Sequence, residues 1–252
     1  MLGGVLAVAV AVLVGAVLQS ATGFGFALVV GPVLLLVTTP AQSLTTLVLL
    51  GLVLNLLLLG TERRVPQVAR ALLVALLVGA LPGEVLGALL LRVAPTAVLQ
   101  VAVGVLVLVA VGVQLRGRGS AAVAVGPRTA RVGSLGVGAV TGVLSTSTGV
   151  SGPPMVLWLS RVGLAPAPLR DTLAAAFTGL TVTSLAVLAG TDQLRLPPGG
   201  LLLVAGLLVL VVLGQRLGRA VFSRLSPRAF RAASLLVVTA AGLISIVSGL
   251  TP

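Results

Sequence analysis

The sequence predicts an all-α polytopic membrane protein with two inverted repeats of about five helical segments each. Composition is the first reason: 58% of the 252 residues are hydrophobic, only 8% are charged, and the mean hydropathy is +1.26. The second is that the apolar runs are long and continuous, as membrane-spanning helices require, whereas strands of a membrane barrel alternate. The third is a glycine-centred break inside an apolar segment, which occurs once in each half of the chain.

The apolar segments follow one another in the same order in both halves. A polar connection at 116–130, predicted to be a cytoplasmic linker, separates a first repeat at 1–115 from a second at 131–252. Gly83 and Gly87 correspond to Gly214 and Gly218, and we expect these glycines to lie at helix contacts. The predicted segments lie at about 2–19, 25–38, 42–60, 68–92, 96–115, 131–147, 152–160, 168–190, 198–224 and 229–250.

The arginines orient these segments. All 16 basic residues are arginines, and most lie in three regions near segment ends, at 63–70, 116–131 and 216–231. Placing all three regions in the cytoplasm requires the stretch 131–160 to enter the membrane and return, as a re-entrant hairpin or as two crossings. The same shape at 2–38 places both chain termini outside and makes the repeats inverted. A count of eight spans, with each broken stretch as one long helix, fits the arginines less well.

The two breaks are the candidate binding site. Glycine allows backbone conformations that expose N–H groups, and helix starts carry a partial positive charge, so two helix starts meeting near the membrane midplane would attract an anion. Paired breaks of this kind are typical of transporters. The competing interpretation is close helix packing through small residues. The candidate substrate-binding residues are Thr22, Gly23, Phe24, Gly25, Ser145, Thr146, Thr148, Gly149, Ser151, Gly152 and Pro153.

Two charged residues are candidates for a role beside the breaks. Glu84 is the acidic residue placed well inside a predicted span, so it is a candidate for proton coupling; the alternative is a structural carboxylate paired with an arginine or held neutral. Arg216 is a candidate anion contact, and the alternative is an arginine that extends to the membrane surface. The position of Glu84 corresponds to Gln215 in the second repeat, so the repeats differ chemically here.

Several function classes are excluded by composition. The chain has no cysteine and no histidine, so disulfides and metal sites built on these residues are excluded, and we expect no metal site and no cofactor. No pair of carboxylates shares a segment, so we expect no enzyme. The net charge of +12 comes from arginines at segment ends, and aromatic residues make up only 2% of the chain, which argues against nucleic acid as a partner.

The motifs resemble those of the TauE/SafE family, the sulfite and organosulfonate exporters of bacterial membranes. The resemblance rests on Thr22-Gly23-Phe24-Gly25 with Pro32, on residues 142–145 and 149–154, on Leu169-Arg170, and on the region 214–218. It covers essentially the whole chain. Many relatives have a second glycine where this chain has Ser151. The resemblance implies secondary transport of a small, often sulfur-containing anion, with the two breaks near the substrate path.

We therefore expect a secondary transporter that exports a small anion, such as sulfite or an organosulfonate, by alternating access coupled to an ion gradient of protons or Na⁺. The alternative functions are an anion channel and a membrane scaffold that transports nothing. The expected location is a bacterial inner membrane, with basic loops in the cytoplasm and both termini outside. The expected partners are the lipid bilayer and the anionic substrate, and a homo-oligomer is compatible with the sequence.

Overall fold

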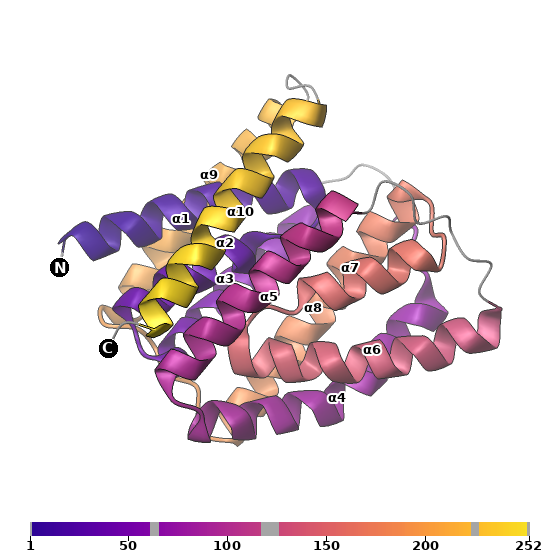
Figure 1. Cartoon of the computed structure of the whole chain (residues 1–252), viewed down its shortest axis with the longest axis horizontal. Helices are drawn as coiled ribbons and strands as arrows, with labels where there is room; N and C mark the ends of the chain where they lie inside the picture. The colour runs from indigo at the N-terminus through magenta and orange to yellow at the C-terminus, as the bar shows by residue number, and fades with distance from the viewer. Residues whose placement is uncertain (1, 61–65, 117–125, 223–226, 251–252) are drawn as a thin grey trace.

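The computed structural model describes residues 2–60, 66–116, 126–222 and 227–250, which form ten α-helices and no strand (Figure 1). The prediction of an all-α protein is confirmed, and every predicted segment has its helix. The helices are α1 (Leu2–Thr22), α2 (Phe26–Val37), α3 (Pro40–Gly60), α4 (Arg70–Val93), α5 (Thr96–Arg116), α6 (Pro127–Thr148), α7 (Gly152–Arg161), α8 (Pro166–Gly190), α9 (Gly200–Phe222) and α10 (Pro227–Leu250).

Five of the described helices, namely α1, α3, α4, α8 and α9, are long and apolar enough to cross a membrane. Their apolar side chains cover much of the outer surface as well as the interior, as expected of a protein surrounded by lipid. Helix α6 begins at Pro127, inside the range 116–130 assigned to the linker, and residues 117–125 of that range lie outside the described residues.

Each broken stretch folds into a helical hairpin. In the α1–α2 hairpin, a Cβ atom built on Gly4 would lie 3.1 Å from Val37, so the start of α1 packs against the end of α2. In the α6–α7 hairpin, the indole Nε1 of Trp158 donates a hydrogen bond of 2.9 Å to Ser134 Oγ, which joins the end of α7 to the first half of α6. Both stretches therefore turn back on themselves, as the arginine positions predict.

Glycines set the packing of α4 against α6, which run side by side and parallel (Figure 1). A Cβ on Gly83 would overlap the carbonyl oxygen of Ala139, and one on Gly87 would overlap that of Val143. The backbones of the two helices are thus in direct contact along a row of small residues spaced four apart, which is the packing expected where lipid supplies no hydrophobic driving force.

The contact between α1 and α9 repeats this arrangement in the other half. A Cβ on Gly214 would lie 2.8 Å from the carbonyl oxygen of Leu13, and one on Gly218 would lie 2.7 Å from that of Val17. When the two Thr-Gly breaks are aligned, Leu13 and Val17 take the places of the two α6 residues just named. The four glycines predicted to lie at helix contacts therefore make equivalent contacts, and the internal repeat is visible in the packing.

The two repeats are inverted relative to each other. The equivalent helices α3 and α8 cross antiparallel, with Gly51 facing Thr181 near their middles and Thr45 Oγ1 accepting from the N–H of Arg195 just after α8. The equivalent helices α5 and α10 are also antiparallel, since Gly249 packs on Ala97 at the start of α5. Equivalent helices that cross antiparallel are related by a two-fold axis that passes between them.

The described arginines mostly gather at one end of the molecule. Helices α4 and α6 are parallel and begin with arginines, and α7 ends beside the start of α6. Arg170, at the start of α8, donates to the carbonyl oxygen of Ser20 near the end of α1. Helix α9 packs against α1 and runs parallel to it, so the end of α9 lies at the same face as the start of α8. The chain termini lie at the opposite end (Figure 1). The placement of the arginine-rich end in the cytoplasm stays a prediction.

Candidate functional site

Left-handed glycines form both hairpin turns. Gly23 and Gly25, between α1 and α2, have φ angles of 84° and 115°, and Gly149, after α6, has a φ of 73°. Residues with a Cβ atom rarely adopt these angles, so glycine is needed at each turn. The turns let α2 begin at Phe26 and α7 begin at Gly152 in the interior of the molecule, where the sequence places its two breaks.

The starts of α2 and α7 lie next to each other. A Cβ on Gly152 would be 3.7 Å from the ring of Phe24, so the two turns are in contact. The first N–H groups of a helix have no partner within the helix, and the helix dipole adds a partial positive charge there. The prolines at 153 and 154 remove two donors from α7, and the N–H of Phe26 donates to Gln19 Oε1 at 3.1 Å. The remaining donors of α2 and the dipoles of both helices converge on one place.

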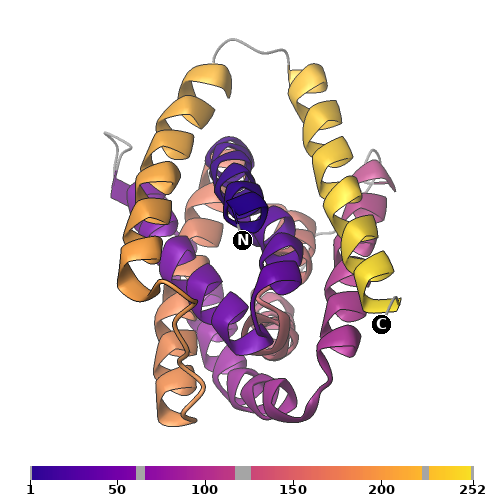
Figure 2. The same ribbon diagram turned by 90° about the vertical axis from the view of Figure 1, so that its left-hand side faces the viewer.

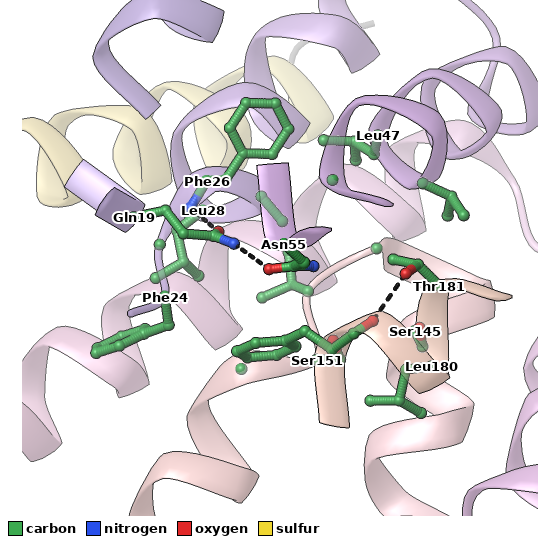
Figure 3. Close-up of a pocket in the computed structure, with 18 residues that line it drawn as sticks. Gln19, Phe24, Phe26, Leu28, Leu47, Asn55, Ser145, Ser151, Leu180 and Thr181 are labelled. Atoms are coloured by element: carbon green, nitrogen blue, oxygen red, sulfur yellow. Dashed lines mark hydrogen bonds between the residues drawn. The ribbon is translucent and has the colours of Figure 1, made fainter. Parts of the chain in front are cut away.

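A cavity of about 60 Å³ lies where these helix starts meet (Figure 3). Its polar lining consists of two amides and three hydroxyls, from Gln19, Asn55, Ser145, Ser151 and Thr181, and no charged side chain of the described residues lines it. Gln19 Nε2 donates to Asn55 Oδ1 at 2.7 Å, which fixes both amides. The rest of the lining is apolar or glycine: Phe24, Gly25, Phe26, Ala27, Leu28, Leu47, Val48, Gly51, Gly149, Val150, Gly152, Phe177 and Leu180.

The cavity lies at the two-fold axis that relates the repeats. Gly51 and Thr181, which face each other where α3 crosses α8, both line it. The turn residues Gly25 and Ser151, which take equivalent places in the aligned breaks, line it from the two hairpins. Each half therefore contributes the same elements, a hairpin turn and the middle of a long helix. In Figure 2 the α1–α2 hairpin lies between α9 and α10, the corresponding outer helices of the second repeat.

The structure brings together about half of the predicted site residues. Phe24, Gly25, Ser145, Gly149, Ser151 and Gly152 line the cavity. Thr146 instead donates to the carbonyl oxygen of Glu84 at 2.7 Å, and Thr148 donates to Leu144 within its own helix. Gly23 belongs to the turn, but it lies beside Arg170 and does not line the cavity. Pro153 is buried at the start of α7. The side chain of Thr22 lies outside the described residues.

The two charged candidates lie away from the cavity lining. Arg216 is exposed on α9, and its role as an anion contact stays a prediction. Glu84 is completely buried, and its Oε1 accepts hydrogen bonds of 2.9 Å from Thr183 and from Ser184. Ser184 Oγ is 3.0 Å from Ser145 Oγ, so Glu84 connects to the cavity through two hydroxyls.

The site residues predicted from the sequence do not include the lining residues that α3 and α8 contribute, nor Gln19 of α1. Thr181, Thr183 and Ser184 form a group of hydroxyls inside an apolar segment, which is a signal that the sequence carries. Gln19 is a buried amide just before the first break and could have been found in the same way. Phe177 and Leu180 give no such signal, because apolar residues of one helix differ only in the direction they face.

Nearly the whole chain is similar to one known family. The family described as "Sulfite exporter TauE/SafE" matches residues 7–244, which include both hairpins and Glu84. No curated protein and no solved structure matches the chain. The match agrees with the motifs at the two hairpin turns and with the apolar helices, which make this a multi-pass membrane protein of a transporter family. The chain belongs to the TauE/SafE sulfite exporter family.

Proposed function

We propose that this protein is a secondary transporter that exports a small anion, sulfite or an organosulfonate, across the bacterial inner membrane. One observation carries the proposal: the starts of two helices from inverted repeats meet at one small cavity, which no charged side chain lines in the part of the chain that the structure describes. Helix starts favour anions, and the uncharged lining leaves that preference uncompensated. The family adds sulfite as the substrate class.

The proposed mechanism is alternating access. The hairpins approach the cavity from opposite ends of the molecule, since α1 begins at the end where the chain termini lie and α6 begins at the arginine-rich end (Figure 1). In inverted repeats the two halves can exchange conformations, so that the cavity opens to one side and then to the other. The proposal places the arginine-rich face in the cytoplasm and both chain ends outside.

Counterflow in proteoliposomes tests the proposed function. Vesicles loaded with an excess of one unlabelled anion should take up the labelled form transiently, because a carrier exchanges substrate across a membrane without net flow. We expect saturable counterflow for sulfite and for at least one sulfonate, and little for acetate. Flux that does not saturate would indicate a channel instead, and no flux for any anion tested would contradict the proposal.

A further inference from the structure

The buried carboxylate of Glu84 breaks the two-fold arrangement of the repeats. Its position in α4 corresponds to that of Gln215 in α9, which is also buried but carries no charge. Of the four acidic residues in the chain, Glu84 lies in the interior of a membrane-spanning helix, 0% exposed. Intramembrane carboxylates are costly to keep and frequently functional.

The surroundings of Glu84 supply hydroxyls and no cation. Oε1 accepts from Thr183 and Ser184, and Oε2 has no hydrogen-bond partner among the described residues. The helices packed against α4 are α6 and α8, and apart from Glu84 the charged residues of all three helices lie toward their ends. They are Arg70 and Arg92 on α4, Arg128 and Arg131 on α6, and Arg170 and Asp171 on α8, and none of them pairs with Glu84.

The hydrogen bonds have a fixed direction when Glu84 is ionised. A carboxylate only accepts, so Ser184 donates to Oε1, and Ser145 must then donate to Ser184. The Ser145 side chain is part of the cavity lining (Figure 3). A continuous line of two hydroxyls therefore joins the cavity to the carboxylate.

We infer that Glu84 binds the proton that is cotransported with the anion, and that Ser145 and Ser184 relay this proton from the cavity. The inference rests on the proposed anion transport and names its coupling ion. In the relay, a hydronium ion in the cavity gives a proton to Ser145 Oγ while the proton of Ser145 passes to Ser184 Oγ and that of Ser184 passes to Glu84 Oε1. Each serine ends with one proton, water is left in the cavity, and the carboxylate is neutral.

The direction of coupling follows from charge. An ionised Glu84 repels an anion in the cavity, and a protonated Glu84 does not, so that proton binding and anion binding favour each other by the same factor. Proton and anion therefore cross in the same direction, and export proceeds when the outward gradient of the anion exceeds the inward gradient of protons. Na⁺ fits this place less well, because the hydroxyl groups already donate to Oε1 and a hard cation needs several oxygen ligands facing it.

The test compares two kinds of transport in the same proteoliposomes. One is accumulation of labelled methanesulfonate or sulfate driven by a pH gradient, and the other is counterflow at equal pH. Both anions stay ionised over the pH range used, so a pH gradient alone does not distribute them. With the wild-type protein we expect the labelled anion to accumulate on the alkaline side. We expect Glu84→Gln to lower the ratio of gradient-driven accumulation to counterflow by roughly tenfold, which is within the usual range of coupling between two binding sites.

Matched variants make the outcome decisive. Asp192→Asn, which removes an exposed carboxylate paired with Arg195, should leave the ratio as in the wild type. If Glu84→Gln does not fold, Ser145→Ala decides, because it interrupts the relay and should lower the same ratio. A wild-type ratio in either folded variant would overturn the inference, as would accumulation on the acidic side or accumulation driven by a Na⁺ gradient instead. Normal counterflow without any accumulation driven by the pH gradient would contradict the inference alone, whereas absent counterflow would contradict the proposed function.

Discussion

Replacing Gly51 with leucine should abolish transport while the protein still folds. Gly51 lies in the middle of α3 and lines the cavity, and a Cβ atom there would make an ordinary contact of 3.8 Å with Thr181. The cavity of about 60 Å³ is small, because one water molecule needs roughly 10–15 Å³ of such space. A leucine side chain would fill it and leave no room for an anion. Leucine also favours a helix over glycine by roughly 0.8–1 kcal/mol, so we expect no loss of stability.

The same substitution at Gly60 is the matched control. Gly60 ends the same helix, and a Cβ atom there would meet nothing within 4 Å. We expect Gly60→Leu to transport like the wild type and Gly51→Ala to transport at an intermediate rate, as measured by counterflow of labelled sulfite. Normal counterflow by a folded Gly51→Leu protein would show that the substrate does not pass through this cavity.

The second prediction concerns the stability of the protein and tests the contact between α4 and α6. Gly138 and Gly136 lie two residues apart on α6, and alanine should act in opposite directions at the two places. A Cβ on Gly138 would overlap the carbonyl oxygen of Leu76 in α4, whereas a Cβ on Gly136 would meet nothing within 4 Å. Overpacking of a tight interface costs roughly 1–3 kcal/mol, and here the obstacle is backbone that cannot rotate away. At Gly136 the gain in helix propensity of about 0.5–1 kcal/mol remains.

Thermal unfolding in detergent, followed by circular dichroism, measures this difference. We expect Gly138→Ala to lower the unfolding temperature and Gly136→Ala to raise it slightly or leave it unchanged. If both variants unfolded at the same temperature as the wild type, the backbone contact between α4 and α6 described above would be wrong.

Much of the fold could be predicted from the sequence. The apolar segments gave the helices, because a chain in lipid must satisfy its backbone within each helix. The breaks at Gly23-Phe24-Gly25 and at Gly149 could be located because only glycine adopts the backbone angles found there. The inverted relation followed from the arginines, since the membrane allows only two orientations for each segment.

The lining of the cavity could be predicted only in part, because it depends on how each helix is rotated. Successive residues of a helix point about 100° apart. Ser145 therefore faces the cavity, while the adjacent Thr146 faces α4 and donates to the carbonyl oxygen of Glu84. Both belong to the same hydroxyl-rich motif, and nothing in the motif distinguishes them. The rotation is set by the glycine contacts with α4, which are tertiary packing.

In the proposed anion site, the starts of two helices take the place of a lysine or an arginine. The two inverted repeats each place one helix start at their common axis, so the partial charges of α2 and α7 act on one volume. Each helix start contributes roughly 0.3–1 kcal/mol toward an anion. A preference of this size suits a carrier, which must release its substrate on the other side as well as bind it.

The central claim is that this cavity prefers anions, and alkylation of one introduced cysteine measures that preference. The chain has no cysteine of its own, so Ser151→Cys places a single thiol at the start of α7, in the cavity lining. Iodoacetate and iodoacetamide are nearly equal in shape and differ in charge. Their ratio of rates cancels the reactivity of the thiol, because both reagents attack the same thiolate.

The ratio is compared with that of a small neutral thiol in solution. Two helix starts that together contribute about 0.6–2 kcal/mol should favour iodoacetate by roughly 3- to 30-fold over the reference thiol. An excess of methanesulfonate should slow both reactions by occupying the cavity. A ratio equal to or below that of the reference thiol, with no protection by the sulfonate, would contradict an anion site between the two hairpins.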